Sequence, residues 1–177
     1  MPLKGRVREL WLPGMKLVEI ERFVDERGMF HELMRSDWRE LLGDDVIVQV
    51  NMSITYPGII RAWHRHLRGQ VDYFFVARGV AKICAYDEET QHLAEVVLSD
   101  TKPQILRIPG HYWHGFKAQG IEPVYLVYFT TRLYDYQNPD EERRPWNDPT
   151  IKPIRINGNP NDPRCNKPWD WNYPPHK

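Results

Sequence analysis

Four ionisable side chains could act together in chemistry. They are His64, His66 and Asp72 in one stretch of the sequence and His114 in a later motif. Residues two apart in a β-strand share a face, so His64 and His66 are expected to point the same way. A turn at Arg68-Gly69 would return the chain and bring Asp72 opposite the two histidines. Such a group can move protons, or it can bind a divalent transition metal such as Fe, Mn, Ni or Zn. A histidine pair in a strand is also often only an interior hydrogen-bonded feature.

Short β-rich runs are the elements expected to position these side chains. Eight strands are predicted, at Lys16–Glu21, Val46–Thr55, Ile59–His66, Val71–Ala77, Val80–Tyr86, His92–Leu98, Gln104–Ile108 and Val124–Thr131. Turn signals separate several of them, among them Pro57-Gly58, Arg78-Gly79 and Pro109-Gly110. One helix is predicted over Asp37–Leu42, with Ser36 as its N-cap and Gly43 as its C-terminal stop. This pattern predicts an all-β antiparallel barrel or sandwich, here a jelly roll.

The composition is that of an ordinary globular protein. The 177 residues are 41% hydrophobic, and 24 Lys and Arg balance 24 Asp and Glu. There is therefore no basic field to bind nucleic acid or an anionic membrane. With no signal-peptide pattern and no apolar run near 18 residues, we expect a cytoplasmic protein.

One domain is predicted over residues 1–177, with a core at about 15–155 and an extended Pro-rich tail at 156–177. Trp169 and Trp171 are expected to anchor this tail on the barrel. Cys84 and Cys165 are too few for a disulfide framework, and the sequence leaves open whether they meet.

The histidine motifs resemble the two motifs of the cupin superfamily. A Gly is followed by His64-Arg-His66 and then Asp72, and a later Pro-Gly precedes His114, although Asp stands where Glu is usual. Cupins with these residues commonly bind a divalent transition metal by three imidazoles and one carboxylate. The resemblance therefore implies a metal-binding alternative in which His64, His66, Asp72 and His114 are the ligands.

Six motifs in order resemble one family more specifically, the dTDP-4-dehydrorhamnose 3,5-epimerases. Together they cover roughly residues 15 to 155. They are Phe23-Val-Asp-Glu-Arg27-Gly-Met-Phe-His-Glu32, Gln49-Val-Asn51-Met-Ser53, Arg61-Ala-Trp-His64, Ile108-Pro-Gly-His-Tyr-Trp-His114-Gly-Phe116, Tyr128-Phe-Thr-Thr-Arg-Leu-Tyr134 and Trp146-Asn-Asp-Pro149.

The family resemblance implies a homodimeric jelly roll that binds a dTDP-4-keto-6-deoxyhexose and needs no cofactor. His64 matches the base that removes a proton beside the ketone, and Tyr134 matches the acid that returns a proton to the opposite face. Arginines suit contacts to the diphosphate or the sugar because a guanidinium can bind an anion through two hydrogen bonds. The contacts implied for the nucleotide or sugar are Phe23, Arg27, Glu32, Gln49, Asn51, Arg61 and His114.

Asp72 is the most serious departure from the family pattern, which usually has a lysine at this point. That lysine stabilises the charge on the 4-keto oxygen as the enolate forms. An ionised, unpaired carboxylate there would repel the enolate by about 4 kcal/mol at 4 Å and an effective dielectric near 20, on the order of a thousandfold in rate. His66, also absent from the family pattern, offers two remedies. It can pair with Asp72 as imidazolium and carboxylate, or both can bind a metal that polarises the ketone.

Two further features do not fit the family. The C-terminal Asp that supports the base has no clear match, although Asp162 is a candidate. Strict alternation also puts Arg61 and His64 on opposite faces of a strand, which a β-bulge or a subunit boundary could resolve. Three other functions therefore stay open: a sugar 3,4-ketoisomerase, a metal-dependent cupin enzyme and a non-catalytic sugar-nucleotide binding protein.

Overall fold

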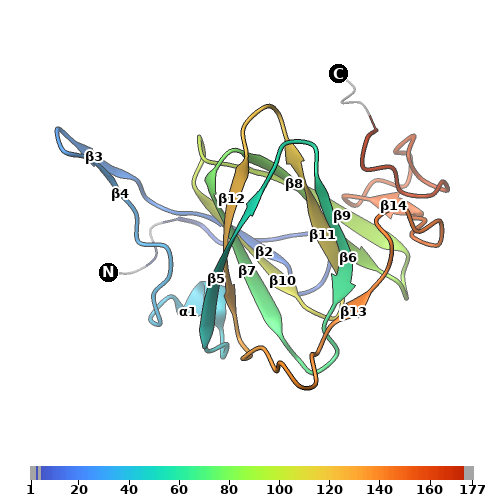
Figure 1. The fold of residues 1–177 in the computed structure, drawn as a ribbon, viewed down its shortest axis with the longest axis horizontal. Coiled ribbons are helices and arrows are strands. Elements are labelled where there is room, and N and C mark those ends of the chain that lie inside the picture. Colours follow the sequence, from blue (N-terminus) through green and yellow to red (C-terminus); the bar gives the residue numbers. More distant parts are fainter. Residues whose placement is uncertain (1–2, 4, 174–177) are drawn as a thin grey trace.

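The computed structural model describes residue 3 and residues 5–173, in which two six-stranded sheets enclose a common interior (Figure 1). The first sheet has the order β1 (Arg8–Glu9), β2 (Lys16–Glu19), β10 (Gln104–Pro109), β7 (Val71–Arg78), β12 (Val124–Thr130) and β5 (Gln49–Thr55). The second has the order β13 (Glu142–Arg143), β6 (Ile60–Arg65), β11 (Trp113–Gln119), β8 (Val80–Asp87), β9 (His92–Ser99) and β14 (Arg155–Ile156). Only β14, beside β9, pairs in parallel within these sheets. The predicted all-β jelly roll is confirmed.

The secondary structure differs from the prediction mainly in its shortest elements. For β11 the sequence predicted a strand but not its bounds. Strands β1, β13 and β14 were not predicted, and neither was the hairpin of β3 (Phe23–Asp25) and β4 (Gly28–Phe30). The predicted helix is shorter, with α1 spanning Arg39–Leu42, and the prediction that Ser36 caps it is wrong. Trp38 is the N-cap and makes no side-chain capping bond, because an indole has no acceptor for a backbone N–H. The backbone N–H of Trp38 donates to the carbonyl of Arg35 in a preceding turn. The helix ends at Gly43, as predicted.

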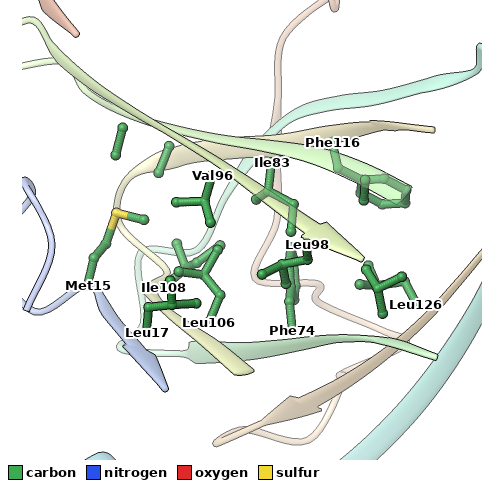
Figure 2. Close-up of a cluster of buried hydrophobic side chains, with 14 of the residues drawn as sticks. Met15, Leu17, Phe74, Ile83, Val96, Leu98, Leu106, Ile108, Phe116 and Leu126 are labelled. Carbon is green, nitrogen blue, oxygen red and sulfur yellow. The ribbon is translucent and has the colours of Figure 1, made fainter. Parts of the chain in front are cut away.

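The main core lies between the two sheets (Figure 2). β7 shows how the alternation builds it, since Phe74 and Val76 point into this core while Tyr73 and Phe75 point to the outer side. The outer side of β7 is buried as well, because apolar residues of the N-terminal segment and of α1 cover it. Asp72 has the parity of Phe74, so its carboxylate enters the barrel interior, where it is only 2% exposed.

A second apolar cluster joins the C-terminal segment to the outer side of the second sheet. Trp169 and Trp171 are buried there, and the Trp171 ring centroid lies 4.9 Å from that of Trp63. Cys84 and Cys165 belong to the same cluster and are both free thiols. Residues 174–177 of the predicted tail lie outside the described residues. Within the described chain, no helix is long and apolar enough to cross a membrane.

Candidate functional site

A cavity of 910 Å³ opens at the barrel interior. Strands β5, β6, β7 and β12 supply its walls together with the segment that follows β12. This segment crosses from the first sheet to the second, because β12 belongs to one and β13 to the other. Seven residues predicted from the sequence line the cavity: Gln49, Asn51, Arg61, His64, His66, Asp72 and Tyr134.

A β-bulge explains how Arg61 and His64 can both face this cavity. In the β6–β11 ladder His64 is opposite His114 and Arg61 is opposite Phe116, with a register shift between the two pairs. Three steps along β6 therefore match two steps along β11, and the extra residue reverses the alternation. The guanidinium of Arg61 donates from Nε to the Thr55 hydroxyl at 2.9 Å, which leaves its two terminal nitrogens available to a ligand.

Asp72 lies at the centre of the four predicted ionisable residues. Its Oδ2 is 3.1 Å from Nε2 of His114 and 3.3 Å from Nε2 of His66. One nitrogen or oxygen from each of the four, His64 included, lies within 4.8 Å of those of the others. The structure thus brings together the three residues that the spacing predicted to meet and also His114, as the cupin resemblance implied. His114 is fully buried and does not line the cavity, so the nucleotide or sugar contact implied for it stays a prediction.

Backbone carbonyls hold two of the three imidazoles in place. Nδ1 of His66 donates to the carbonyl of Asp140 at 2.5 Å, and Nδ1 of His114 donates to the carbonyl of Tyr112 at 2.8 Å. In each neutral ring the proton is then on Nδ1, and Nε2 presents a lone pair. The ring nitrogens of His64 have no hydrogen-bond partner among the described residues, although its ring centroid is 4.1 Å from that of His114.

The electrostatics separate His64 from His66. Burial, reinforced by His114, holds the pKa of His64 well below its ordinary value, which favours the neutral, basic form. Burial also acts to lower the pKa of His66, but the hydrogen bond and charge of Asp72 outweigh burial and raise it. Burial acts to raise the pKa of Asp72, but its interactions with the His114 and His66 imidazoles outweigh burial and lower it.

Three further predicted contacts, besides His114, do not line the cavity. Phe23, Arg27 and Glu32 lie on or just after the β3–β4 hairpin, which extends away from the barrel (Figure 1). Arg27 forms an ion pair with Asp25, and Glu32 pairs with Arg35 at 2.9 Å. Within one chain these side chains therefore do not join the site.

The crossing segment carries functional candidates that the sequence reasoning missed. Tyr136 lines the cavity beside Tyr134, with 5.0 Å between the ring centroids. Arg132 also lines it, and its guanidinium makes no hydrogen bond or ion pair with any described residue. The carboxylate of Asp140 accepts the backbone N–H groups of Leu67 and Arg68, each at 2.9 Å, and thereby fixes the segment to the turn after β6. Proximity to Tyr134 in the chain was the one available signal for these residues.

Asp162 does not take the place of the C-terminal Asp of the family. Its carboxylate accepts hydrogen bonds from Arg164, including one from Nε at 2.9 Å, and it does not line the cavity. Arg164 also reaches Glu95 on β9 at 2.8 Å, so this group ties the C-terminal segment to the second sheet.

Comparisons with known proteins agree with this geometry. The model of a family described as polysaccharide biosynthesis C-terminal domain matches residues 23–142. The probable low-salt glycan biosynthesis epimerase Agl13 of Haloferax volcanii is 43% identical over 143 residues, covering 76% of this chain and 90% of the relative. A dTDP-4-dehydrorhamnose 3,5-epimerase of Methanothermobacter thermautotrophicus is 32% identical over 154 residues, covering 79% of this chain and 78% of the relative.

A solved structure matches the fold over a similar span. The dTDP-6-deoxy-D-glucose-3,5-epimerase RmlC of Legionella pneumophila, in complex with dTDP-4-keto-L-rhamnose, aligns with a TM-score of 0.74 and 25% identity, covering 83% of this chain and 81% of that chain. The relatives cover most of both chains, and the matched span contains the cavity strands. The chain therefore belongs to the polysaccharide biosynthesis C-terminal domain family and, within the cupins, to the dTDP-4-dehydrorhamnose 3,5-epimerase family.

Proposed function

We propose that this chain is a nucleotide-sugar epimerase that inverts a centre next to the 4-keto group of a dTDP-4-keto-6-deoxyhexose. The observation that carries the proposal is the position of His64. Its imidazole has no hydrogen-bond partner among the described residues and lies on the wall of a cavity large enough for a sugar nucleotide. Its lowered pKa keeps the ring neutral at physiological pH, the form that a general base requires.

Inversion requires a proton donor on the other face of the sugar carbon. Tyr134 is the proposed acid, because its segment crosses the cavity mouth from β12 to β13. Tyr136 is the alternative acid, since its ring packs against that of Tyr134. The chemistry is acid–base catalysis: the base takes the acidic proton beside the ketone, and the tyrosine protonates the enolate from the opposite side.

The diphosphate is proposed to bind between Arg61 and Arg132. Both guanidinium groups reach the cavity, and neither is neutralised by an ion pair with a described residue. Arg143, by contrast, already pairs with Glu141 at 2.8 Å. Gln49 and Asn51 are proposed sugar or nucleotide contacts from β5, where the Gln49 amide already orients the Tyr134 backbone through a 2.9 Å hydrogen bond.

Deuterium exchange separates the two proton transfers. With a dTDP-4-keto-6-deoxyhexose in D₂O, the native protein is expected to incorporate deuterium and invert the centre. His64→Gln should lose exchange by about 10²- to 10⁴-fold, the usual cost of removing a general base. Tyr134→Phe should retain exchange without inversion, because the base can return the proton to the original face. The same behaviour in Tyr136→Phe instead would reassign the acid, and no exchange by native protein at any pH between about 5 and 9 would refute the proposal.

A homodimer is proposed to complete the site. The hairpin exposes apolar side chains, with Val24 70% and Phe30 61% exposed, and the edge strand β5 exposes Met52 at 60%. A second copy packed on this face would cover these residues and offer its Phe23, Arg27 and Glu32 to the neighbouring cavity.

Met52→Lys tests the dimer, since a charge in an apolar interface is costly. Sedimentation should show a native dimer and a monomeric variant with a raised KM. The matched control is Val97→Lys on the outer face of β9, where the same substitution should leave the dimer intact. A native monomer with full activity would refute this arrangement.

The structure gives no support to a 3,4-ketoisomerase that uses His64 and His66 as a proton-transfer pair. Both nitrogens of His66 are engaged, Nδ1 by the Asp140 carbonyl and Nε2 by Asp72. NMR analysis of the product distinguishes the reactions, because an isomerase would move the carbonyl from C4 to C3. The cytoplasmic location stays a prediction.

A further inference from the structure

We propose that His66, Asp72 and His114 form a three-ligand site for a divalent transition metal, with His64 left beside it as a free base. The site differs from the family resemblance, which implies a lysine at position 72 and no metal. It also differs from the four-ligand alternative, because His64 is excluded.

The first argument is a mismatch of hydrogen-bonding groups. The Nδ1 protons of His66 and His114 are both committed to backbone carbonyls, at 2.5 and 2.8 Å. Both Nε2 lone pairs then face Oδ2 of Asp72, which is itself an acceptor, at 3.3 and 3.1 Å. Three acceptors at these distances repel one another unless a positive charge, either a shared proton or a metal ion, lies among them.

The second argument is the distance between the ligand atoms. Metal bonds to imidazole nitrogen and carboxylate oxygen are about 2.0–2.2 Å long, so two ligands of one ion lie about 3.0 Å apart at right angles and about 3.4 Å apart in a tetrahedron. The observed separations of 3.1 and 3.3 Å from Asp72 Oδ2 to the two imidazoles fall within that range.

The third argument is the support behind the ligands. An imidazole that binds a metal commonly donates its other N–H to a carbonyl or carboxylate, which fixes the ring and its tautomer. Both rings have such a carbonyl here, whereas His64 has none among the described residues. The remaining carboxylate oxygen of Asp72 accepts a hydrogen bond from the Gln70 amide at 2.8 Å, which orients Oδ2 toward the imidazoles.

Two imidazoles and one carboxylate are suitable ligands for Fe, Mn, Co, Ni or Zn, and they leave coordination positions open. Asp72 and His66 both line the cavity, so an open position would face a bound sugar. The role of the ion rests on the proposed function: it would polarise the ketone oxygen as a Lewis acid. Binding of the ion itself does not depend on that function.

Metal content tests the site directly. Purified protein stripped with a chelator is dialysed separately against Mn²⁺, Co²⁺ or Zn²⁺ and analysed for bound metal, with the Co²⁺ absorption spectrum as a second readout. We expect about one ion per chain, and affinity at least tenfold lower in His66→Gln and Asp72→Asn, which lose a ligand. His64→Gln should retain the ion, and so should His111→Gln, a matched control on an exposed histidine outside the site.

Each outcome has a distinct meaning. Native protein that binds none of the three ions refutes the metal site, and an imidazolium–carboxylate pair then explains the cluster. Loss of the ion in His64→Gln refutes the three-ligand assignment. Thermal unfolding of every variant without metal identifies any variant that fails to fold, and the native titration needs no variant. Deuterium exchange by metal-free protein would support the epimerase function without the metal. A bound ion without deuterium exchange would support the metal site and contradict the epimerase function.

Discussion

Asp72→Asn should preserve the fold of the metal-free protein, although it removes a buried charge. The new amide oxygen can accept the hydrogen bond that Gln70 now donates to Oδ1 at 2.8 Å. The amide nitrogen then stands where Oδ2 stands and can donate one hydrogen to each Nε2 of His66 and His114. Every polar group stays paired and both rings are neutral. Because the substitution leaves no buried polar group unpaired, we expect a change within about 1 kcal/mol.

Asp72→Ala should be clearly destabilising, because it leaves the same partners unpaired. The Gln70 amide loses its acceptor, and the two Nε2 lone pairs receive no donor, whereas the new amide of Asp72→Asn supplies one to each. Each unpaired buried group costs about 1–3 kcal/mol. Water in the adjoining cavity can satisfy some of them, so we expect about 2–4 kcal/mol in total. At about 2–4 °C per kcal/mol, the melting temperature should fall by about 4–16 °C.

Urea unfolding of chelator-treated protein at pH 7.5 measures both effects, provided that each transition is two-state. Asp44→Ala is the control, since this exposed carboxylate on the loop after α1 should contribute less than about 0.5 kcal/mol. If Asp72→Asn is destabilised as much as Asp72→Ala, the carboxylate charge itself stabilises the fold. The resting cluster is then an ion pair, and the reasoning from mismatched acceptors is wrong.

Three other predictions concern parts of the chain away from this cluster. Tyr73→Phe should lower the free energy of unfolding by about 1.5–3 kcal/mol in urea titrations, because the hydroxyl donates to the charged Asp45 at 2.5 Å. Trp171→Ala should cost about 3–5 kcal/mol by the same measurement, since this ring is 1% exposed and contacts Trp63. Arg132→Ala should raise KM about 10- to 100-fold with kcat nearly unchanged if it binds the diphosphate; an unchanged KM would remove Arg132 from the site.

Much of the site was predictable because it depends on local periodicity. The i, i+2 rule places His64 and His66 near each other, and the glycine turn after β6 brings Asp72 back to them. The motif at His114 was expected on a strand, and the ladder places it opposite His64. These relations need only alternation and a turn, both of which the residue types reveal.

Other parts of the site depend on backbone geometry that residue types do not reveal. The bulge opposite Phe116 lets Arg61 share the cavity with His64, and no residue in Arg61-Ala-Trp-His64 signals it. The orientation of the His66 ring is fixed by a hydrogen bond to the backbone carbonyl of Asp140. Every residue has such a carbonyl, so no side-chain pattern predicts this hydrogen bond. Phe23 was expected at the site, but the β3–β4 hairpin carries it away from the cavity of its own chain, and residue types do not show where a hairpin points.

The two departures from the family pattern, the loss of a lysine and the gain of His66, have one electrostatic explanation if a metal is bound. A divalent ion on the single carboxylate of Asp72 leaves one net positive charge near the cavity wall, the same charge that the lysine would supply. A protonated His66 beside Asp72 leaves none, so the enolate would lack its counter-charge. Metal-free protein should therefore exchange deuterium more slowly, by as much as about a thousandfold if the lost stabilisation approaches 4 kcal/mol. Equal rates with and without metal would show that the enolate charge is stabilised elsewhere, with Arg61 as the nearest candidate.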